Sequence, residues 1–172
     1  MDRIMLIGPG GAGKSTLARE LGERLDIEVH HLDALLWKPG WTLTTREEQK
    51  EIQRGLFDGE RWIVDGNYGA TMDLRLQAAD TVIFMDMPRR VCMYGIFSRR
   101  IRYHGKTRPD MQKDCPERLN YEFIKWVWNY RKSKRSGVLS KLESLGSDKQ
   151  VIILKSRKDV RRFLEEIGRR PS

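Results

Sequence analysis

The residues best suited to chemistry lie in one glycine-rich run near the start of the chain. Residues 8–15 read Gly-Pro-Gly-Gly-Ala-Gly-Lys-Ser and match the pattern G-x-x-x-x-G-K-[ST] at every position. A tight turn of this composition points successive backbone N–H groups inward, and it forms a nest for anions that side chains would obstruct. A helix beginning at Ser15 would add the positive end of its dipole.

These properties predict a site for ATP and Mg²⁺ in this run, which we call the phosphate loop (residues 8–15). We expect Lys14 to act in catalysis by bridging the β- and γ-phosphates, and the Ser15 hydroxyl to ligate Mg²⁺. The predicted nucleotide contacts here are Gly8, Pro9, Gly10, Gly11, Ala12, Gly13, Lys14, Ser15 and Thr16.

A dinucleotide site is the competing interpretation of the same glycines. Gly8, Gly10 and Gly13 also spell G-x-G-x-x-G, and Asp33 lies 20 residues beyond Gly13. That spacing is typical of a dinucleotide fingerprint, but the fingerprint does not require a Lys-Ser pair after the last glycine. The residues Lys14-Ser15 therefore favour a triphosphate.

Two aspartates follow strand-like runs and are candidates for the catalytic chemistry. Asp33 follows His30-His31-Leu32, and Asp65-Gly66 follows Trp62–Val64. If the acceptor is a hydroxyl, Asp33 would take its proton as a base, whereas an acceptor phosphate would only be oriented by it. Asp65 could hold a water on Mg²⁺ or meet the acceptor. Both positions also suit ordinary turn or cap residues, and we interpret the two histidines either as structural or as neighbours that support the site residues without touching the ligand.

Four further residues are candidates for contacting the acceptor. Trp37 and Trp41 lie in a loop around Pro39-Gly40, where they could sandwich a nucleobase or simply pack beneath the loop. Asn67 follows the Asp65-Gly66 pair, and Arg75 could hold an acceptor phosphate. We expect all four to bind substrate together with Asp33 and Asp65.

Apolar runs of strand length alternate with stretches of helical period. The strand-like runs are Arg3–Ile7, Glu28–Leu32, Trp62–Val64, Thr81–Met85 and Val151–Leu154. The helical stretches are Ser15–Leu25, Thr45–Phe57, Arg89–Tyr103, Glu117–Arg131 and one that starts near Ser156. This alternation predicts an α/β fold of three layers, with five parallel strands between helices. Ligands in such sheets bind beyond the carboxyl ends of the strands, where the glycines and aspartates would meet.

The net charge of +9 is concentrated in one segment. Residues 86–137 hold 14 Lys and Arg against 5 Asp and Glu, which indicates an anionic partner such as polyphosphate or nucleic acid. Within this segment we expect 99–116 to form a small helical lid that includes a turn-rich connector at Lys106–Cys115. We expect Arg99 and Arg102 to stabilise the charge that develops during phosphoryl transfer. A solvated basic face is the alternative explanation for part of the run.

Length and composition indicate a single domain over residues 1–172 and no membrane partner. The chain is 39% hydrophobic and 33% charged, with no apolar run long enough to cross a bilayer. Its two cysteines, Cys92 and Cys115, are expected to be reduced. These features predict a cytoplasmic protein.

The chain resembles the adenylate-kinase-like group of small P-loop kinases, and more narrowly the bacterial DNA topology modulation proteins. The resemblance covers most of the chain through GPGGAGKST, HHLDALLWKPGW, WIVDGNYGATMDLR, ADTVIFMDMPRR, KTRPDMQKDCPE and FIKWVWNY. It implies strand order 2-3-1-4-5, Mg²⁺ waters held by Asp65, lid arginines at Arg99 and Arg102, and an adenine pocket at Ser156 and Arg157. Adenylate kinase has Phe-Pro-Arg where this chain continues with Asn67-Tyr68, which argues against AMP as the acceptor.

Together these features predict an ATP-dependent phosphotransferase, similar to nucleotide and nucleoside kinases, that acts on a small-molecule acceptor. The alternative is an ATP-binding regulator that grips nucleic acid through residues 86–137. The sequence leaves the identity of the acceptor and the oligomeric state open.

Overall fold

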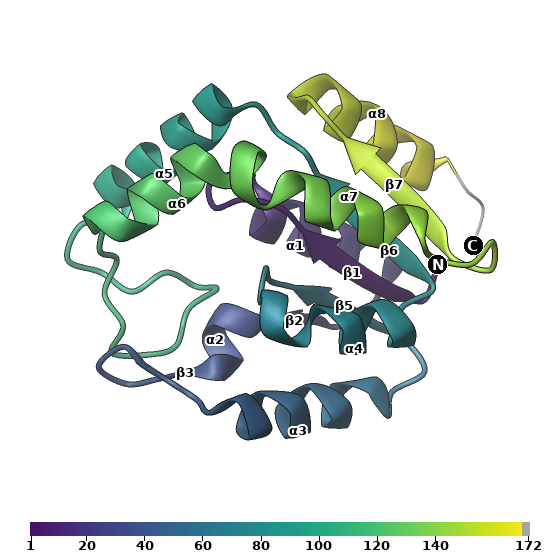
Figure 1. Cartoon of the computed structure of the whole chain (residues 1–172), viewed down its shortest axis with the longest axis horizontal. Helices are drawn as coiled ribbons and strands as arrows, with labels where there is room; N and C mark the ends of the chain where they lie inside the picture. The colour runs from purple at the N-terminus through teal and green to yellow at the C-terminus, as the bar shows by residue number, and fades with distance from the viewer. Residues whose placement is uncertain (170–172) are drawn as a thin grey trace.

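A five-stranded parallel sheet organises the computed structural model, which describes residues 1–169 (Figure 1). The strand order is β2-β5-β1-β6-β7, and every neighbouring pair is parallel. The strands are β1 (Arg3–Ile7), β2 (Val29–His31), β5 (Trp62–Asp65), β6 (Thr81–Met85) and β7 (Gln150–Leu154). Since these are the five main strands in chain order, the predicted fold class and the order 2-3-1-4-5 are confirmed.

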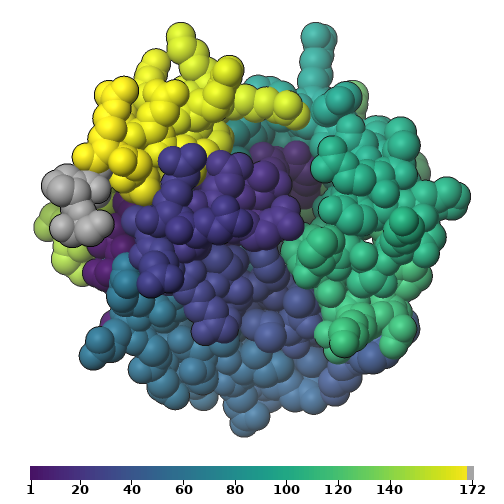
Figure 2. Space-filling model, turned by 180° about the vertical axis from the view of Figure 1, so that it is seen from behind, coloured from purple at the N-terminus to yellow at the C-terminus, as the bar shows by residue number. Residues whose placement is uncertain are grey.

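Alternation along β1 divides the core between the two faces of the sheet. Ile4 and Leu6 join an apolar cluster with α1 (Lys14–Leu25) and α8 (Arg157–Gly168). Met5 and Ile7 join a second cluster with α4 (Met72–Ala78) and α7 (Arg135–Glu143). Successive side chains of a strand point to opposite faces, so a fully apolar β1 requires helices on both. Seen from behind, the purple N-terminal part lies between the yellow C-terminal helix and the teal α5 region (Figure 2).

The region after β6 holds two helices joined by an irregular segment. Helix α5 (Arg89–Arg102) runs beside α6 (Tyr121–Ser133) (Figure 1). Residues 103–120, which we call the connector, contain no helix, so the predicted helical lid at 99–116 is helical only over its first four residues. Turns at Gly105 and Pro109 interrupt the connector, and α6 begins only after Asn120 accepts a hydrogen bond from the Phe123 N–H at 2.7 Å. The predicted helix start at Glu117 is therefore wrong by several residues.

Short elements account for most of the other differences from the sequence prediction. Leu32 begins α2 (Leu32–Leu36) instead of ending a strand, and the loop after it forms a hairpin of β3 (Trp37–Lys38) and β4 (Thr42–Leu43). The short helix η1 (Gly69–Thr71) precedes α4. By contrast α3 (Arg46–Phe57) begins as predicted, with the capping box of Thr45 and Glu48 formed in both directions. Within residues 1–169, no helix is long and apolar enough to span a bilayer.

Candidate nucleotide and acceptor site

A cleft of about 630 Å³ lies beyond the carboxyl ends of β1, β2 and β5. Its size is typical of small-molecule sites. The predicted site residues that line it are Gly10, Gly11, Gly13, Lys14, Ser15, Thr16, Asp33, Trp37, Trp41, Asp65, Asn67, Arg99, Arg102 and Arg157. Gly8, Pro9 and Ala12 belong to the same loop but do not line the cleft.

The backbone of the phosphate loop fits a chain of phosphates. Gly11 and Gly13 have φ angles of +74° and +94°, which L side chains rarely adopt. A Cβ on Gly11 would lie 2.2 Å from the Cys92 carbonyl oxygen, and one on Gly95 of α5 would lie equally close to the Gly11 oxygen. Only paired glycines allow this contact between loop and helix. The N-terminus of α1 follows directly, so its dipole adds to the anion nest.

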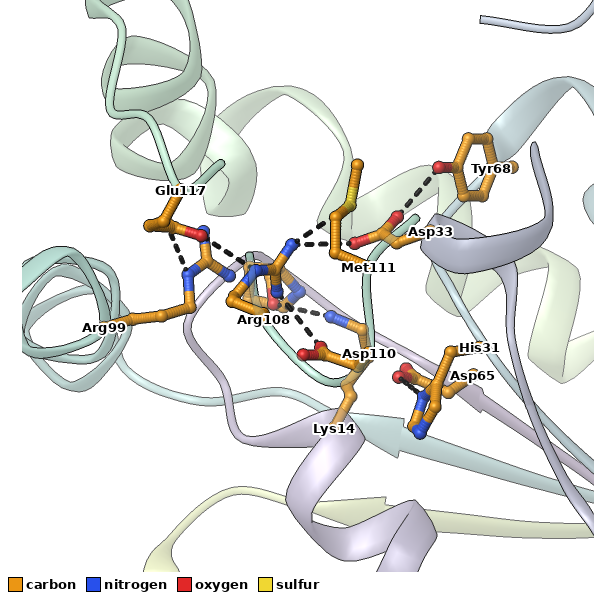
Figure 3. Close-up of polar contacts among 11 residues, drawn as sticks. Lys14, His31, Asp33, Asp65, Tyr68, Arg99, Arg108, Asp110, Met111 and Glu117 are labelled. Carbon is orange, nitrogen blue, oxygen red and sulfur yellow. Dashed lines mark hydrogen bonds and ion pairs between the residues drawn. The ribbon is translucent and has the colours of Figure 1, made fainter. Parts of the chain in front are cut away.

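The Lys14 side chain crosses its own loop. Its Nζ donates a hydrogen bond to the Pro9 carbonyl oxygen at 3.0 Å (Figure 3). Because a lysine is a compact charge on a flexible stem, it can exchange this carbonyl for phosphate oxygens when a nucleotide binds.

Asp65 ends β5 beside His31, one of the two histidines expected to be structural or to support the site residues. His31 and Asp65 are register partners in neighbouring strands, and His31 Nδ1 lies 3.0 Å from Asp65 Oδ2 (Figure 3). The other oxygen, Oδ1, is buried and has no hydrogen-bond partner among the described residues. A buried carboxylate oxygen without a partner is costly. A water bound to Mg²⁺ would supply the missing donor, so this pair fits the predicted metal role.

Arg108 is the centre of an ion-pair network that joins the connector to α2. Its Nη1 donates to Asp110 Oδ2 at 3.0 Å, and its Nη2 lies 3.5 Å from Asp33 Oδ2. Its Nε lies 2.8 Å from Glu117 Oε2, while Glu117 Oε1 accepts a hydrogen bond from Arg99 Nε at 2.9 Å (Figure 3). The network therefore holds two predicted site residues, Asp33 and Arg99, through three that were not predicted as site residues.

Burial makes these ion pairs strong. The Glu117 and Arg108 side chains are only 1% and 7% exposed. Burial alone would lower the pKa of Arg108, but Asp110, Asp33 and Glu117 together raise it. For Asp110, burial acts to raise the pKa, and Arg108 and the Ser15 hydroxyl outweigh it and lower the pKa. Arg108 and Asp110 thus remain charged at neutral pH, and their contacts with Asp33 and Ser15 hold the connector beside α2 and the phosphate loop.

Replacing Glu117 with glutamine is expected to lower the free energy of unfolding by about 3 kcal/mol, because two guanidinium groups lose a buried carboxylate. The value lies at the low end for such a loss, since Arg108 keeps Asp110. Urea denaturation measures it, with Glu143→Gln at the exposed end of α7 as the matched control. Equal stability of the two variants would contradict this account of the network.

Asp33 lies in the first turn of α2 and is held from a second side. The Tyr68 hydroxyl donates to Asp33 Oδ1 at 2.8 Å (Figure 3). Burial and the nearby Asp33 charge raise the pKa of Tyr68 far above its usual value, so the phenol stays a donor. The Asp33 carboxylate is still 43% exposed to the cleft. It is therefore oriented and also able to accept a further hydrogen bond.

The two indoles of the β3–β4 hairpin pack edge to face. The ring centroids of Trp37 and Trp41 are 5.4 Å apart with an interplanar angle of 71°. Trp41 has a φ of +65°, which is rare and strained for a bulky residue. The Arg118 guanidinium lies 4.1 Å above the Trp41 ring, and the hairpin is tied to the connector by a Cys115 Sγ contact of 3.4 Å to the Lys38 carbonyl oxygen. This packing holds Trp41 at the edge of the cleft.

Two predicted site residues are placed elsewhere. Arg75 is fully buried: its Nη1 donates to Gln53 Oε1 at 2.6 Å, and its Nη2 donates to the Tyr68 carbonyl oxygen at 3.0 Å. Burial lowers the pKa of Arg75 to about 10, so it stays charged, but it faces the protein interior and does not reach the cleft. The Ser156 hydroxyl accepts the Asp159 N–H at 3.1 Å and caps α8. The burial of Arg75 could not be predicted from the sequence, because its hydrogen bonds to distant residues produce no periodic pattern along the chain.

The chain is similar to known proteins in structure but not in sequence. No family model and no curated protein matches the chain. A shikimate kinase from Acinetobacter baumannii in complex with shikimate is similar, with a TM-score of 0.64 at 16% identity over 97% of this chain and 90% of that one. Shikimate kinases from Bacteroides thetaiotaomicron (0.54, 18% identity, 96% of each chain) and Aquifex aeolicus (0.52, 20% identity, 96% and 92%) are similar too.

At these identities the likeness concerns the fold. The narrower resemblance to the DNA topology modulation proteins stays a prediction. The chain has the adenylate-kinase-like fold of the small P-loop kinases.

Proposed function

We propose that this protein is an ATP-dependent phosphotransferase that phosphorylates a hydroxyl group of a small molecule. One observation carries the proposal: the phosphate loop and Asp33 open into the same cleft, and Asp110 and Arg108 link them. A carboxylate held beside a phosphate cradle is the arrangement that a hydroxyl kinase needs, because the acceptor proton must be removed as the phosphoryl group arrives. The shared fold with small-molecule kinases supports the same reading.

The donor side of the site would be formed by the loop and the arginines around it. The loop N–H groups and Lys14 would bind the phosphates of ATP, and Arg99 and Arg102 would neutralise charge on the transferred group. Ser15 and a water on Asp65 would hold Mg²⁺, which supplies positive charge between the phosphates. Arg157 lines the cleft at the start of α8, where it would contact the nucleotide.

On the acceptor side, Asp33 would act as the base. The acceptor hydroxyl gives its proton to Asp33, and its oxygen forms a bond to the γ-phosphorus of ATP. The bond from that phosphorus to the β–γ bridging oxygen breaks, and ADP leaves with the electron pair. Tyr68 and Arg108 orient Asp33, since each donates to one of its two oxygens.

The nucleic-acid alternative loses support because several of the basic residues form ion pairs within the protein. Arg99 and Arg108 are paired with Glu117, and Arg135 donates to both oxygens of Asp86 at 2.8–3.0 Å. Several cations of segment 86–137 are thus used within the fold, which leaves fewer of them for a phosphate backbone.

An ADP-release screen with Mg·ATP tests the proposal. Nucleosides, nucleoside monophosphates and sugars are supplied in turn, and at least one should raise ADP release above background hydrolysis. A regulator would instead show no acceptor-dependent release, and its binding to DNA or RNA would weaken steeply with salt. That pair of results would refute the kinase.

A further inference from the structure

The half of the cleft next to β2 and β5, which we call the acceptor half, has an unusual charge balance. It is lined by Asp33, Trp37, Trp41 and Tyr68, and Arg108 and Asp110 of the connector cover it. Its buried cation, Arg108, is shared among the carboxylates of Asp33, Asp110 and Glu117, and Arg99 also pairs with Glu117. The cation at the exposed rim of this half is Arg118, whose guanidinium stacks on the Trp41 ring.

The arginines that could recognise an anion are already occupied. Arg108 uses Nη1, Nη2 and Nε on three carboxylates, and its side chain is only 7% exposed. Arg75, which would otherwise hold an acceptor phosphate, is turned into the interior toward Gln53 and Thr71. Arg118 lies at the exposed rim and stacks on Trp41. Bidentate arginine forks are strong binding groups for phosphate and carboxylate, and the buried guanidinium that the described residues place in this half, that of Arg108, is already paired.

The other groups of the acceptor half suit an uncharged ring with hydroxyl groups. The edge-to-face indoles provide flat apolar surfaces against which a base or a sugar ring can pack. Asp33 remains 43% exposed and accepts hydrogen bonds, so it selects donors and repels anions.

From the paired state of Arg108 and the withdrawal of Arg75 we infer that the acceptor is an uncharged, hydroxyl-bearing ring compound, and not a monophosphate or a carboxylic acid. The inference rests on the proposed function and narrows its substrate class. It also separates this chain from its structural neighbour, whose bound shikimate is a carboxylate.

Matched acceptor pairs test the inference on the wild-type protein. Each nucleoside is compared with its 5′-monophosphate, and each hexose with its hexuronate, at fixed Mg·ATP. The uncharged member of the best pair should have a kcat/KM about 100-fold higher, because the anion would leave charges unpaired. A preference for the anionic member overturns the inference but still supports the proposed phosphotransferase function. If no member of any pair raises ADP release above background, both the inference and the proposed kinase function are overturned.

The variant Asp110→Asn tests whether paired Arg108 sets the preference. Loss of this negative charge leaves the positive charge of Arg108 less neutralised, so the ratio of kcat/KM between uncharged and anionic acceptors should fall about tenfold. Asp114→Asn, in the same connector but exposed and outside the cleft, should leave the ratio unchanged. The ratio is independent of the fraction of folded enzyme, since both acceptors are measured on one preparation. Equal ratios in the two variants would overturn the assignment.

Discussion

Replacing Lys14 with alanine should lower acceptor-dependent kcat/KM about 10³-fold. The ammonium group is the cation that the fold places at the mouth of the phosphate loop, where its present partner is the Pro9 carbonyl oxygen. Removing one preorganised donor from a developing charge typically costs 10²–10³-fold in rate, and Lys14 also contributes to binding the phosphates in the ground state.

The measurement is ADP release at saturating acceptor over a range of ATP concentrations, which gives kcat/KM for ATP, with Lys132→Ala as the control. Lys132 lies in the exposed last turn of α6, and its loss should change the rate less than about twofold. Because Lys132 belongs to the basic segment, it would matter more than Lys14 if that segment bound nucleic acid. A fall of less than tenfold for Lys14→Ala would place the phosphates outside this loop.

Replacing Asp33 with asparagine should lower kcat about 10²–10⁴-fold, because the acceptor loses its base. Asparagine keeps a carbonyl oxygen for the Tyr68 hydroxyl, so the loss would report on proton transfer rather than on local packing. Tyr68→Phe should cost only about tenfold, since it removes one orienting hydrogen bond.

Single-turnover assays with the best acceptor measure both effects, and Asp58→Asn at the exposed end of α3 is the control. Near-normal turnover in Asp33→Asn would mean that no base is needed, as for an acceptor that is already a phosphate. Such a result would contradict the hydroxyl acceptor and leave the nucleotide site intact.

Local sequence patterns were sufficient to predict most of the fold and the donor side of the site. The five strands, the phosphate loop and the capping box of Thr45 and Glu48 depend on residues within a few positions of one another. Turn chemistry and side-chain period act at that range, so they can be read directly. The same holds for Asp33 and Asp65, because parallel strands bring their carboxyl ends to one edge.

Contacts between distant segments could not be read in that way. Arg108 joins the connector to Asp33, which lies 75 residues earlier, and Arg75 is turned inward by Gln53, 22 residues before it. Short elements such as α2 and the β3–β4 hairpin span too few residues for a period to emerge. The ion pairs that hold the connector join it to other elements, so its position does not follow from the preferences of its own residues.

The chain's own residue order thus accounts for the sheet, the phosphate cradle and the edge at which the carboxylates gather, since each arises from short-range backbone and side-chain preferences. Which charged groups of the acceptor half are paired and which are free was decided only by the tertiary structure. Whether Arg75, Arg99 and Arg108 face a ligand or a neighbouring side chain depends on which partners lie within hydrogen-bond distance after the helices pack. No spacing along the chain encodes that outcome.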